Sequence, residues 1–532
     1  MELTRTNFEE NLPIVQAAVS DAEFVAIDFE FSGLHMPAAH DRLGPQSLFD
    51  SMSEHYAKCR QSVQHFRPLQ LGIACVSKDH RISVFHTHTL PAPNVTEFDE
   101  VPFCADSRQF LADNNFDFNK WMQAGTYFMN ATQQRRTKTF LRQTRLITGL
   151  SPTELTHQLM AYRRDDRDYD PNDIDSSDQL SIDNNSAPLD SSRLSESVES
   201  DTSDYALTDD WLDAVLLPVT QANQLIDLLI ESRKPLIGHN CLYDLMYLYD
   251  CFVDALPADY DQWKSLAHKH WPLVYDTRVL AAHLKKHLKL LGVDRYKLSM
   301  LYDSVQSLAR FSSIAVTVAD HAHDHASEQR PHEAGHDAYM TAVVYIRLAE
   351  IATLLDQTRI DDPNNNDDPD HMLTEQEQAI RALYRQRLPA DWSPLSVMPA
   401  SANRVNLIRA PCVHVNLSGP DPPITTKFLS VRSPYLFTPL PDTNVLALRA
   451  KLHENNCDVK RVSKRRMVIA AINGMSADRV KATLRQEFGV RVTAYHGRPG
   501  QWRLLAGALT AASTLGALCY VGAKLGRTLL TK

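Results

Sequence analysis

Runs of apolar residues divide most of the chain into short strands and longer helices. Three runs, at 24–31, 69–77 and 82–90, contain closely spaced apolar residues and predict buried strands. Further strands are expected at 235–239 and 272–276, and helices at 132–146, 211–232, 242–253, 277–291 and 333–355. Because strands alternate with helices, the pattern predicts an α/β fold built on a central sheet.

A second pattern follows a polar, Asn- and Pro-rich linker at 357–372 and a connecting segment at 373–425. Residues 426–497 show the order strand, helix, strand, strand, helix, strand, which is typical of a small ferredoxin-like or RRM-like α+β domain. The expected central strand at 465–472, RRMVIAAI, carries no aromatic residue on which a base could stack. This predicts a degenerate RRM-like domain with a structural or protein-binding role.

Residues 504–523 form a run of twenty positions without a charge. That is about the length needed to cross a bilayer, and Arg503 and Lys524 flank it with positive charge. The run predicts a C-terminal transmembrane anchor, which would leave the preceding domains in the cytosol. Its content of Gly, Ala, Ser and Thr leaves a buried helix as the alternative.

The charge of the chain is unevenly distributed. The 532 residues carry a formal net charge of −10, but residues 163–210 alone contain 15 acidic residues and 4 arginines. The rest of the chain is therefore close to neutral. The block of acidic charge predicts that residues 163–210 form a disordered linker. The eight cysteines include no CxxC pair, which argues against a thiolate zinc site.

Two acidic residues interrupt the first predicted strand. Asp28 and Glu30 are two positions apart, so they lie on the same side of the sheet. Carboxylates within an apolar strand are costly to bury unless they are paired or bind a metal. Asp244 follows the strand at 235–239, near the edge of the sheet where α/β proteins bind ligands. Taken alone, an Asp near the start of a helix is more often a cap or a partner of the helix dipole.

The segment PHEAGHDAYM, residues 331–340, has two readings. His332 and His336 match the HExxH zinc-protease pattern, with Glu333 as the base. Alternatively, Asp337 is a metal ligand and His332 a general base. The protease reading explains neither the strand carboxylates nor Asp244. In the second reading four carboxylates suit two hard cations such as Mg²⁺, with Mn²⁺ as a substitute, and this is the DEDDh arrangement of 3′→5′ exonucleases.

These motifs together resemble the family of poly(A)-specific ribonuclease and its PARN-like relatives, most closely the membrane-anchored branch. The matching segments are FVAIDFEFSGL (24–34), NFDFNKWMQAGTYFMN (115–130), KPLIGHN (234–240) and PHEAGHDAY (331–339), followed by NRVNLIRA and VNLSGPD within 403–421. The resemblance implies an RNase H-like core divided into halves at 1–162 and 211–356. It also implies that Phe31, Phe118 and Asn240 line the 3′-terminal nucleotides.

The same resemblance implies a function and a location. In the membrane-anchored branch the expected substrate is the single-stranded 3′ end of a piRNA precursor bound to a PIWI protein and delivered by a Tudor-domain scaffold. The expected location is the mitochondrial outer membrane, with the endoplasmic reticulum as the alternative. Two other functions stay open: a poly(A) deadenylase, and a non-catalytic membrane-tethered RNA-binding scaffold.

Two basic runs are candidates for contact with the RNA backbone. One is the expected helix at 132–146, which contains Arg135, Arg136, Lys138, Arg142 and Arg145. The other contains Lys285, Lys286 and Lys289. A run of charges is usually a solvated helix face, and contact with RNA is the alternative for both runs.

Overall fold

The computed structural model describes the chain in separate ranges. These are residues 1–37, 40–92, 100–148, 209–319, 332–358, 374–397, 399–432, 457–463, 466–471, 474–488 and 491–494. The acidic linker, apart from its last two residues, lies outside the described residues. So do the first helix expected in the C-terminal domain and the expected transmembrane anchor.

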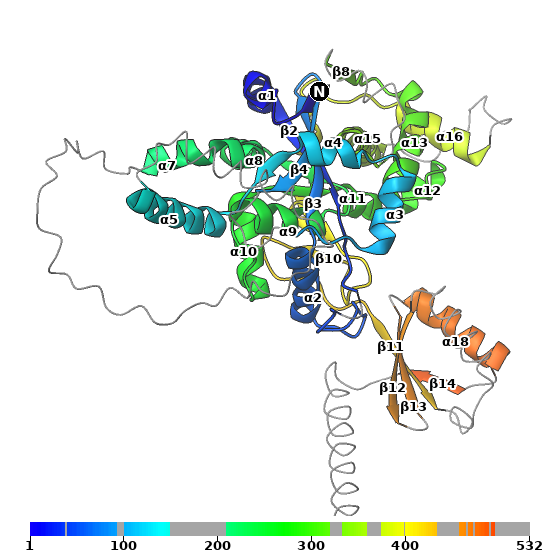
Figure 1. The fold of residues 1–532 in the computed structure, drawn as a ribbon. Helices are drawn as coiled ribbons and strands as arrows, with labels where there is room; N and C mark the ends of the chain where they lie inside the picture. Colours follow the sequence, from blue (N-terminus) through cyan, green and yellow to red (C-terminus); the bar gives the residue numbers. More distant parts are fainter. Residues whose placement is uncertain are drawn as a thin grey trace, which may run out of the picture.

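A mixed ten-stranded sheet forms the centre of the main domain (Figure 1). Its order is β1 (Glu2–Leu3), β4 (Arg81–Pro91), β3 (Pro68–Ser77), β2 (Ala22–Phe31), β6 (Leu236–Gly238), β7 (Val274–Asp276), β9 (Arg404–Asn406), β10 (His414–Asn416), with β5 (Thr126–Phe128) and β8 (Thr317–Val318) paired to β4. β2 runs antiparallel to β3 and parallel to β6. The carboxyl ends of β2, β6 and β7 therefore share one edge of the sheet.

Helices cover both faces of this sheet. One layer contains α1 (Phe8–Asp21), α2 (Met52–His65), α8 (Gln221–Ser232), α9 (Leu242–Leu248) and α10 (Tyr260–His270). The other contains α11 (Thr277–His283), α12 (Lys285–Leu290), α13 (Leu298–Leu308), α15 (Ala334–Thr358) and α16 (Glu375–Tyr384). In β2, Val25 and Ile27 face the first layer, whereas Phe24 and Ala26 face the second. Alternation thus turns Asp28 and Glu30 towards α15.

α15 is the central helix of the second layer. Among the described residues it is the one helix long and apolar enough to cross a membrane, but 89% of its apolar window is buried inside the protein. It packs against β2 and β3 and against α13. These contacts make it a core helix.

Several predicted helices are divided in the structure. The helix expected at 211–232 is split into α7 (Asp209–Leu216), a 3₁₀ turn at Leu217–Val219 and α8. Pro218 lies in that turn, where it lacks the N–H that a continuing helix requires. The helices expected at 242–253 and 277–291 are also divided, the first into α9 and the π-helical turn Tyr249–Val253 and the second into α11 and α12. The helix expected at 132–146 is confirmed as α5 (Ala131–Thr148).

The segment 373–425, which was expected only to connect two domains, extends the main sheet. β9 pairs in parallel with β7, and β10 pairs with β9. The segment also contributes α16, which packs on α15. The three-residue strands are too short to show an alternating pattern in the sequence.

The C-terminal residues form a separate antiparallel sheet in the order β12 (Cys457–Ser463), β13 (Arg466–Ala471), β11 (Lys427–Arg432), β14 (Arg491–Ala494) (Figure 1). One face packs on α18 (Gly474–Phe488). The other face packs against Leu48 and Phe49 of the main domain through Val468 and Ala470. Asp458 on β12 accepts hydrogen bonds from the Ser47 hydroxyl at 3.0 Å and the Leu48 N–H at 2.6 Å.

Candidate active site

The strand β2 contributes the first two carboxylates. Asp28 is half-buried, and Glu30 is only 8% exposed. Their register partners on β3 are Gly72 and Gln70. Because all four residues lie next to the first turn of α15, the site is assembled where this helix begins over the sheet.

Asp244 approaches from the carboxyl end of β6. It lies in the first turn of α9 and is 7% exposed. The loop before it is held by the buried carboxylate of Asp276, which accepts hydrogen bonds from the backbone N–H groups of Asn240 at 2.9 Å and Cys241 at 3.2 Å. The start of α9 is therefore anchored to β7, and this anchor sets where Asp244 can reach.

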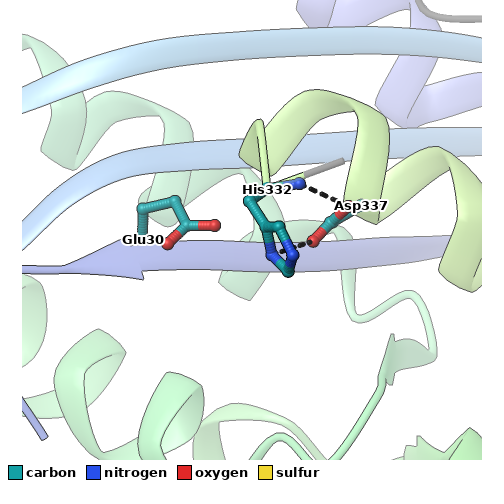
Figure 2. Close-up of side chains that lie close together, drawn as sticks. All are labelled: Glu30, His332 and Asp337. Atoms are coloured by element: carbon teal, nitrogen blue, oxygen red, sulfur yellow. Dashed lines mark hydrogen bonds and ion pairs between the residues drawn. The ribbon is translucent and has the colours of Figure 1, made fainter. Parts of the chain in front are cut away.

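Asp337 and His332 come from the start of α15. Figure 2 shows their side chains and that of Glu30 directed towards one another, and their ligand atoms lie within 4.8 Å of each other. His332 precedes the helix in a left-handed conformation, with φ of 68°. Its backbone N–H donates to Asp337 Oδ1 at 3.3 Å, and its Nδ1 lies 3.9 Å from Asp337 Oδ2.

The four carboxylates repel one another. Burial raises the pKa of Asp28 well above its ordinary value, and the charges of Asp337, Asp244 and Glu30 raise it further. Burial likewise raises the pKa of Glu30, with contributions from Asp337 and Asp244. Burial raises the pKa of Asp244 and that of Asp337 to about 7 each. Clustered carboxylates with raised pKa values are the environment that a bound cation would relieve.

The pKa of His332 is shifted in the opposite direction to that of the carboxylates. Burial lowers its pKa, and the positive charge of Lys297 lowers it further. Its imidazole is therefore neutral at pH 7 and can accept a proton. Its ring packs edge-on against Phe110, with the ring centroids 4.6 Å apart. This contact restrains the ring of a residue that is otherwise partly open to solvent.

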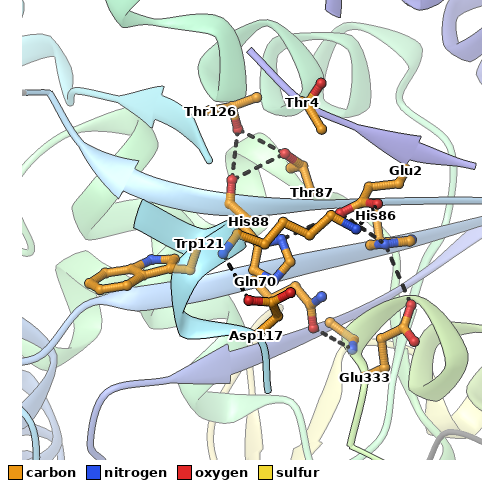
Figure 3. A network of polar contacts seen from close by, with 12 residues as sticks. Glu2, Thr4, Gln70, His86, Thr87, His88, Asp117, Trp121, Thr126 and Glu333 are labelled. Carbon is orange, nitrogen blue, oxygen red and sulfur yellow. Dashed lines mark hydrogen bonds and ion pairs between the residues drawn. The ribbon is translucent and has the colours of Figure 1, made fainter. Parts of the chain in front are cut away.

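A polar network next to the site holds the start of α15 (Figure 3). The Ala334 N–H donates to Gln70 Oε1 at 3.0 Å. Glu333 lies 3.4 Å from His86 Nε2, and His86 and His88 both contact Glu2. Burial opposes ionisation of Glu2, but hydrogen bonds from His88 and Lys120 lower its pKa to about 2. An ionised Glu2 thus anchors the two histidines beside the site.

Comparison with known proteins shows the family of this chain. The model of the CAF1 family ribonucleases matches residues 3–345. This chain belongs to the CAF1 ribonuclease family. Among its relatives, Poly(A)-specific ribonuclease PNLDC1 of Mus musculus is 28% identical over 470 residues, covering 82% of each chain. Pre-piRNA 3′-exonuclease trimmer of Bombyx mori is 22% identical and covers 96% of each chain.

A third relative, Poly(A)-specific ribonuclease PARN of Homo sapiens, is 25% identical and is aligned over 66% of this chain and 62% of its own. Among solved structures, S. pombe Pop2p in its Mg²⁺- and Mn²⁺-bound form matches with a TM-score of 0.32 and 14% identity, over 65% of this chain and 90% of that one. The family and the exonuclease relatives together make this protein a 3′→5′ exoribonuclease.

In this CAF1-family ribonuclease the zinc-protease reading finds no support. α15 begins at Ala334, so His332 lies outside the helix that an HExxH site requires. His336 is buried near Tyr339, and Glu333 is directed to His86. Among the described residues, Glu30, His332 and Asp337 are the one group of three possible metal ligands whose ligand atoms all lie within 4.8 Å of one another.

The three residues expected to line the substrate lie in different surroundings. Phe31 is half-buried and stacks on Tyr247, with the centroids 4.4 Å apart. Phe118 begins α4 (Phe118–Ala124) and packs on Phe103 and Phe116. Asn240 has φ of 60° and accepts a hydrogen bond from Asn406 Nδ2 at 2.7 Å. Their roles in substrate binding stay predictions.

Sequence reasoning missed two features of the site. Phe110, on α3 (Ala105–Asp113), contacts the ring of His332 although it looks like an exposed helix residue. Gly72 lies under the start of α15, where a Cβ would come within 1.9 Å of the Ala334 carbonyl oxygen. A lone glycine in the apolar strand LQLGIACVS was the available signal of such a close approach.

Proposed function

We propose that this exoribonuclease shortens single-stranded RNA from its 3′ end by two-metal-ion hydrolysis. The observation that carries the proposal is that the ligand atoms of Glu30, His332 and Asp337 lie within 4.8 Å of one another. The charges of Asp337 and Asp244 act on this group as well, because they raise the pKa of Asp28 and of Glu30 in addition to the effect of burial. Carboxylate oxygens are the ligands that Mg²⁺ prefers. Asp28, Glu30, Asp244 and Asp337 would hold two Mg²⁺ ions, with Mn²⁺ able to replace them.

The protein's own groups supply positioning and proton transfer. When bound, the two cations would place positive charge against the scissile phosphate and acidify the attacking water. Neutral His332 accepts the proton from that water. Its backbone hydrogen bond to Asp337 and its ring contact with Phe110 fix its position relative to the carboxylates. Phe31 and Phe118 offer aromatic rings to the terminal bases, and Asn240 offers a polar group.

The proposed substrate is the 3′ end of a piRNA precursor held by a PIWI protein. The support is the Bombyx relative, whose name describes a pre-piRNA 3′-exonuclease and which matches over almost the whole length of both chains. A Tudor-domain scaffold is the proposed carrier of the substrate. The uncharged run at 504–523 is the proposed anchor in the mitochondrial outer membrane, with the catalytic domain facing the cytosol.

The test uses the full-length protein with Mg²⁺ and 5′-labelled RNA of mixed sequence. We expect a ladder that shortens from the 3′ end and disappears in Asp28→Asn. Asp106→Asn, which removes an exposed carboxylate from α3, serves as the matched control and should keep full activity. A ladder that persists in Asp28→Asn would contradict the metal assignment. The absence of a ladder with every substrate would favour the non-catalytic scaffold.

A poly(A) deadenylase is the second candidate, because the mouse and human relatives are named poly(A)-specific ribonucleases. The same assay separates the two functions when oligo(A) and mixed-sequence RNA of equal length compete in one reaction. Equal shortening of both substrates supports a sequence-tolerant trimmer. Shortening of oligo(A) alone supports a deadenylase.

A further inference from the structure

A cavity outside the carboxylate cluster combines positive charge with apolar walls. Its volume is about 440 Å³, and it lies between α11 and α12 on one side and the segment from β9 to β10 on the other. Leu407, Val413 and Tyr296 contribute apolar or aromatic surface. Lys285, Arg278 and Arg409 also line it, and none of its lining residues is acidic.

The cations of this cavity differ in how they are held. Arg278 donates to the Tyr296 carbonyl, and Arg409 forms an ion pair with Asp458. Lys285 is exposed and forms no ion pair with the residues that the structure describes. Burial lowers the pKa of His283 and of His414, and the charge of Arg404 lowers each further. The surroundings are therefore electropositive, and Lys285 is the cation available to a ligand.

The position of the cavity connects it with the active site. Asn406 lines the cavity, and its side chain donates to Asn240, at the carboxyl end of β6. The Asn406 N–H donates to Asp276, the same carboxylate that holds the loop before Asp244. β9 is three strands away from β2 in the sheet, which corresponds to about 15 Å at the usual strand spacing. The cavity thus lies further along the sheet edge that carries the carboxylates.

We propose that this cavity binds an internal nucleotide of the RNA substrate, upstream of the 3′ end that is cut, with the phosphate on Lys285. The base would pack on Tyr296 and the apolar wall. The inference rests on the proposed function, because a strand whose 3′ end occupies the carboxylate cluster must leave along the protein surface. Within the described part of the chain Lys285 has no ion-pair partner, and it lies beside an aromatic and apolar wall. A free cation can bind the phosphate of a nucleotide, and such a wall can pack against the base.

The test compares Lys285→Glu with Lys286→Glu. The two lysines are adjacent and exposed, and both substitutions change the net charge equally, but Lys286 does not line the cavity. KM and kcat are measured on a series of RNAs from a dinucleotide to a long oligonucleotide. We expect Lys285→Glu to raise KM about 3- to 10-fold on long RNA only, with kcat unchanged. Lys286→Glu should match the wild type at every length.

Salt dependence provides a second readout. Loss of one phosphate contact should reduce the slope of log KM against log salt by about 0.7 for a single strand. Equal effects of the two substitutions would overturn the proposal, because only overall charge would matter. An effect on dinucleotides, or altered inhibition by nucleoside 5′-monophosphate, would overturn it in favour of a product site. A wild-type protein that shortens no RNA would instead refute the proposed function.

Discussion

Replacing Gly72 by alanine should slow RNA cleavage about 100-fold while the protein stays folded. The added Cβ would lie 1.9 Å from the Ala334 carbonyl oxygen and 2.2 Å from its carbonyl carbon, whereas ordinary contact begins at 3.4 Å. The start of α15 must therefore move by about 1.5 Å, which is the difference between the ordinary contact distance of 3.4 Å and the 1.9 Å to the Ala334 oxygen. Asp337 lies three residues further along this helix, and a displacement of about 1 Å in a catalytic group can cost about 100-fold in rate.

The stability cost of the same change is smaller. Overpacking of a core position costs about 1–3 kcal/mol, which is a fraction of the stability of a typical domain. The assay is single-turnover cleavage of 5′-labelled RNA at saturating Mg²⁺, with the melting temperature followed by circular dichroism. Gly419→Ala is the control, because its Cβ would meet only the side chain of Asn416, at 3.2 Å.

A second substitution tests the contact between α15 and β3 without adding a steric clash. Gln70→Leu removes the acceptor of the Ala334 N–H and leaves that donor unpaired, at a cost of about 1–3 kcal/mol. It should reduce the cleavage rate less than Gly72→Ala does. If a folded Gly72→Ala protein cleaved RNA at the wild-type rate, the packing of α15 on β3 would not set the geometry of the site.

Three other predictions follow from the electrostatics and the domain contacts. His332→Gln should lower kcat about 100- to 10,000-fold without weakening RNA binding. At saturating Mg²⁺ the wild-type kcat should fall as the pH is lowered below the ordinary pKa of an imidazole, because the pKa of His332 is lowered and the base is lost only when it is protonated. A His332→Gln enzyme with unchanged kcat would exclude it as the base. The raised pKa values of Asp244 and Asp337, about 7 in the folded protein against about 3.9 unfolded, mean that the folded state binds more protons between these values. Stability in EDTA should therefore be greater at pH 5 than at pH 8, and Mg²⁺ should raise the melting temperature more at pH 8; thermal melts that show no such difference would count against the cluster. Asp458→Ala should release the C-terminal sheet from Ser47 and Leu48, seen as faster proteolysis near residues 46–49, whereas Asp478→Ala on the exposed face of α18 should not.

The sequence by itself predicted the three longest strands of the main sheet and the acidic residues that they carry. The runs at 24–31, 69–77 and 82–90 correspond to β2, β3 and β4, because short apolar runs of this length favour buried strands. Alternation placed Asp28 and Glu30 on one side of β2, since that periodicity is a property of the extended backbone. The motifs in the sequence also predicted the ribonuclease family, and the family is confirmed.

Tertiary structure alone decided which residues support those carboxylates. Gly72 and Gln70 lie about 260 residues before α15 in the chain (the Gln70–Ala334 separation is 264), so no local pattern relates them to it. The same holds for Asp276, whose carboxylate joins the loop before Asp244 to β9. The pairing of β9 with β7 could not be predicted from the sequence either. A strand of three residues is too short to show an alternating pattern of apolar and polar residues. Long-range hydrogen bonds and close backbone contacts depend on where distant segments meet, and only the folded chain fixes that.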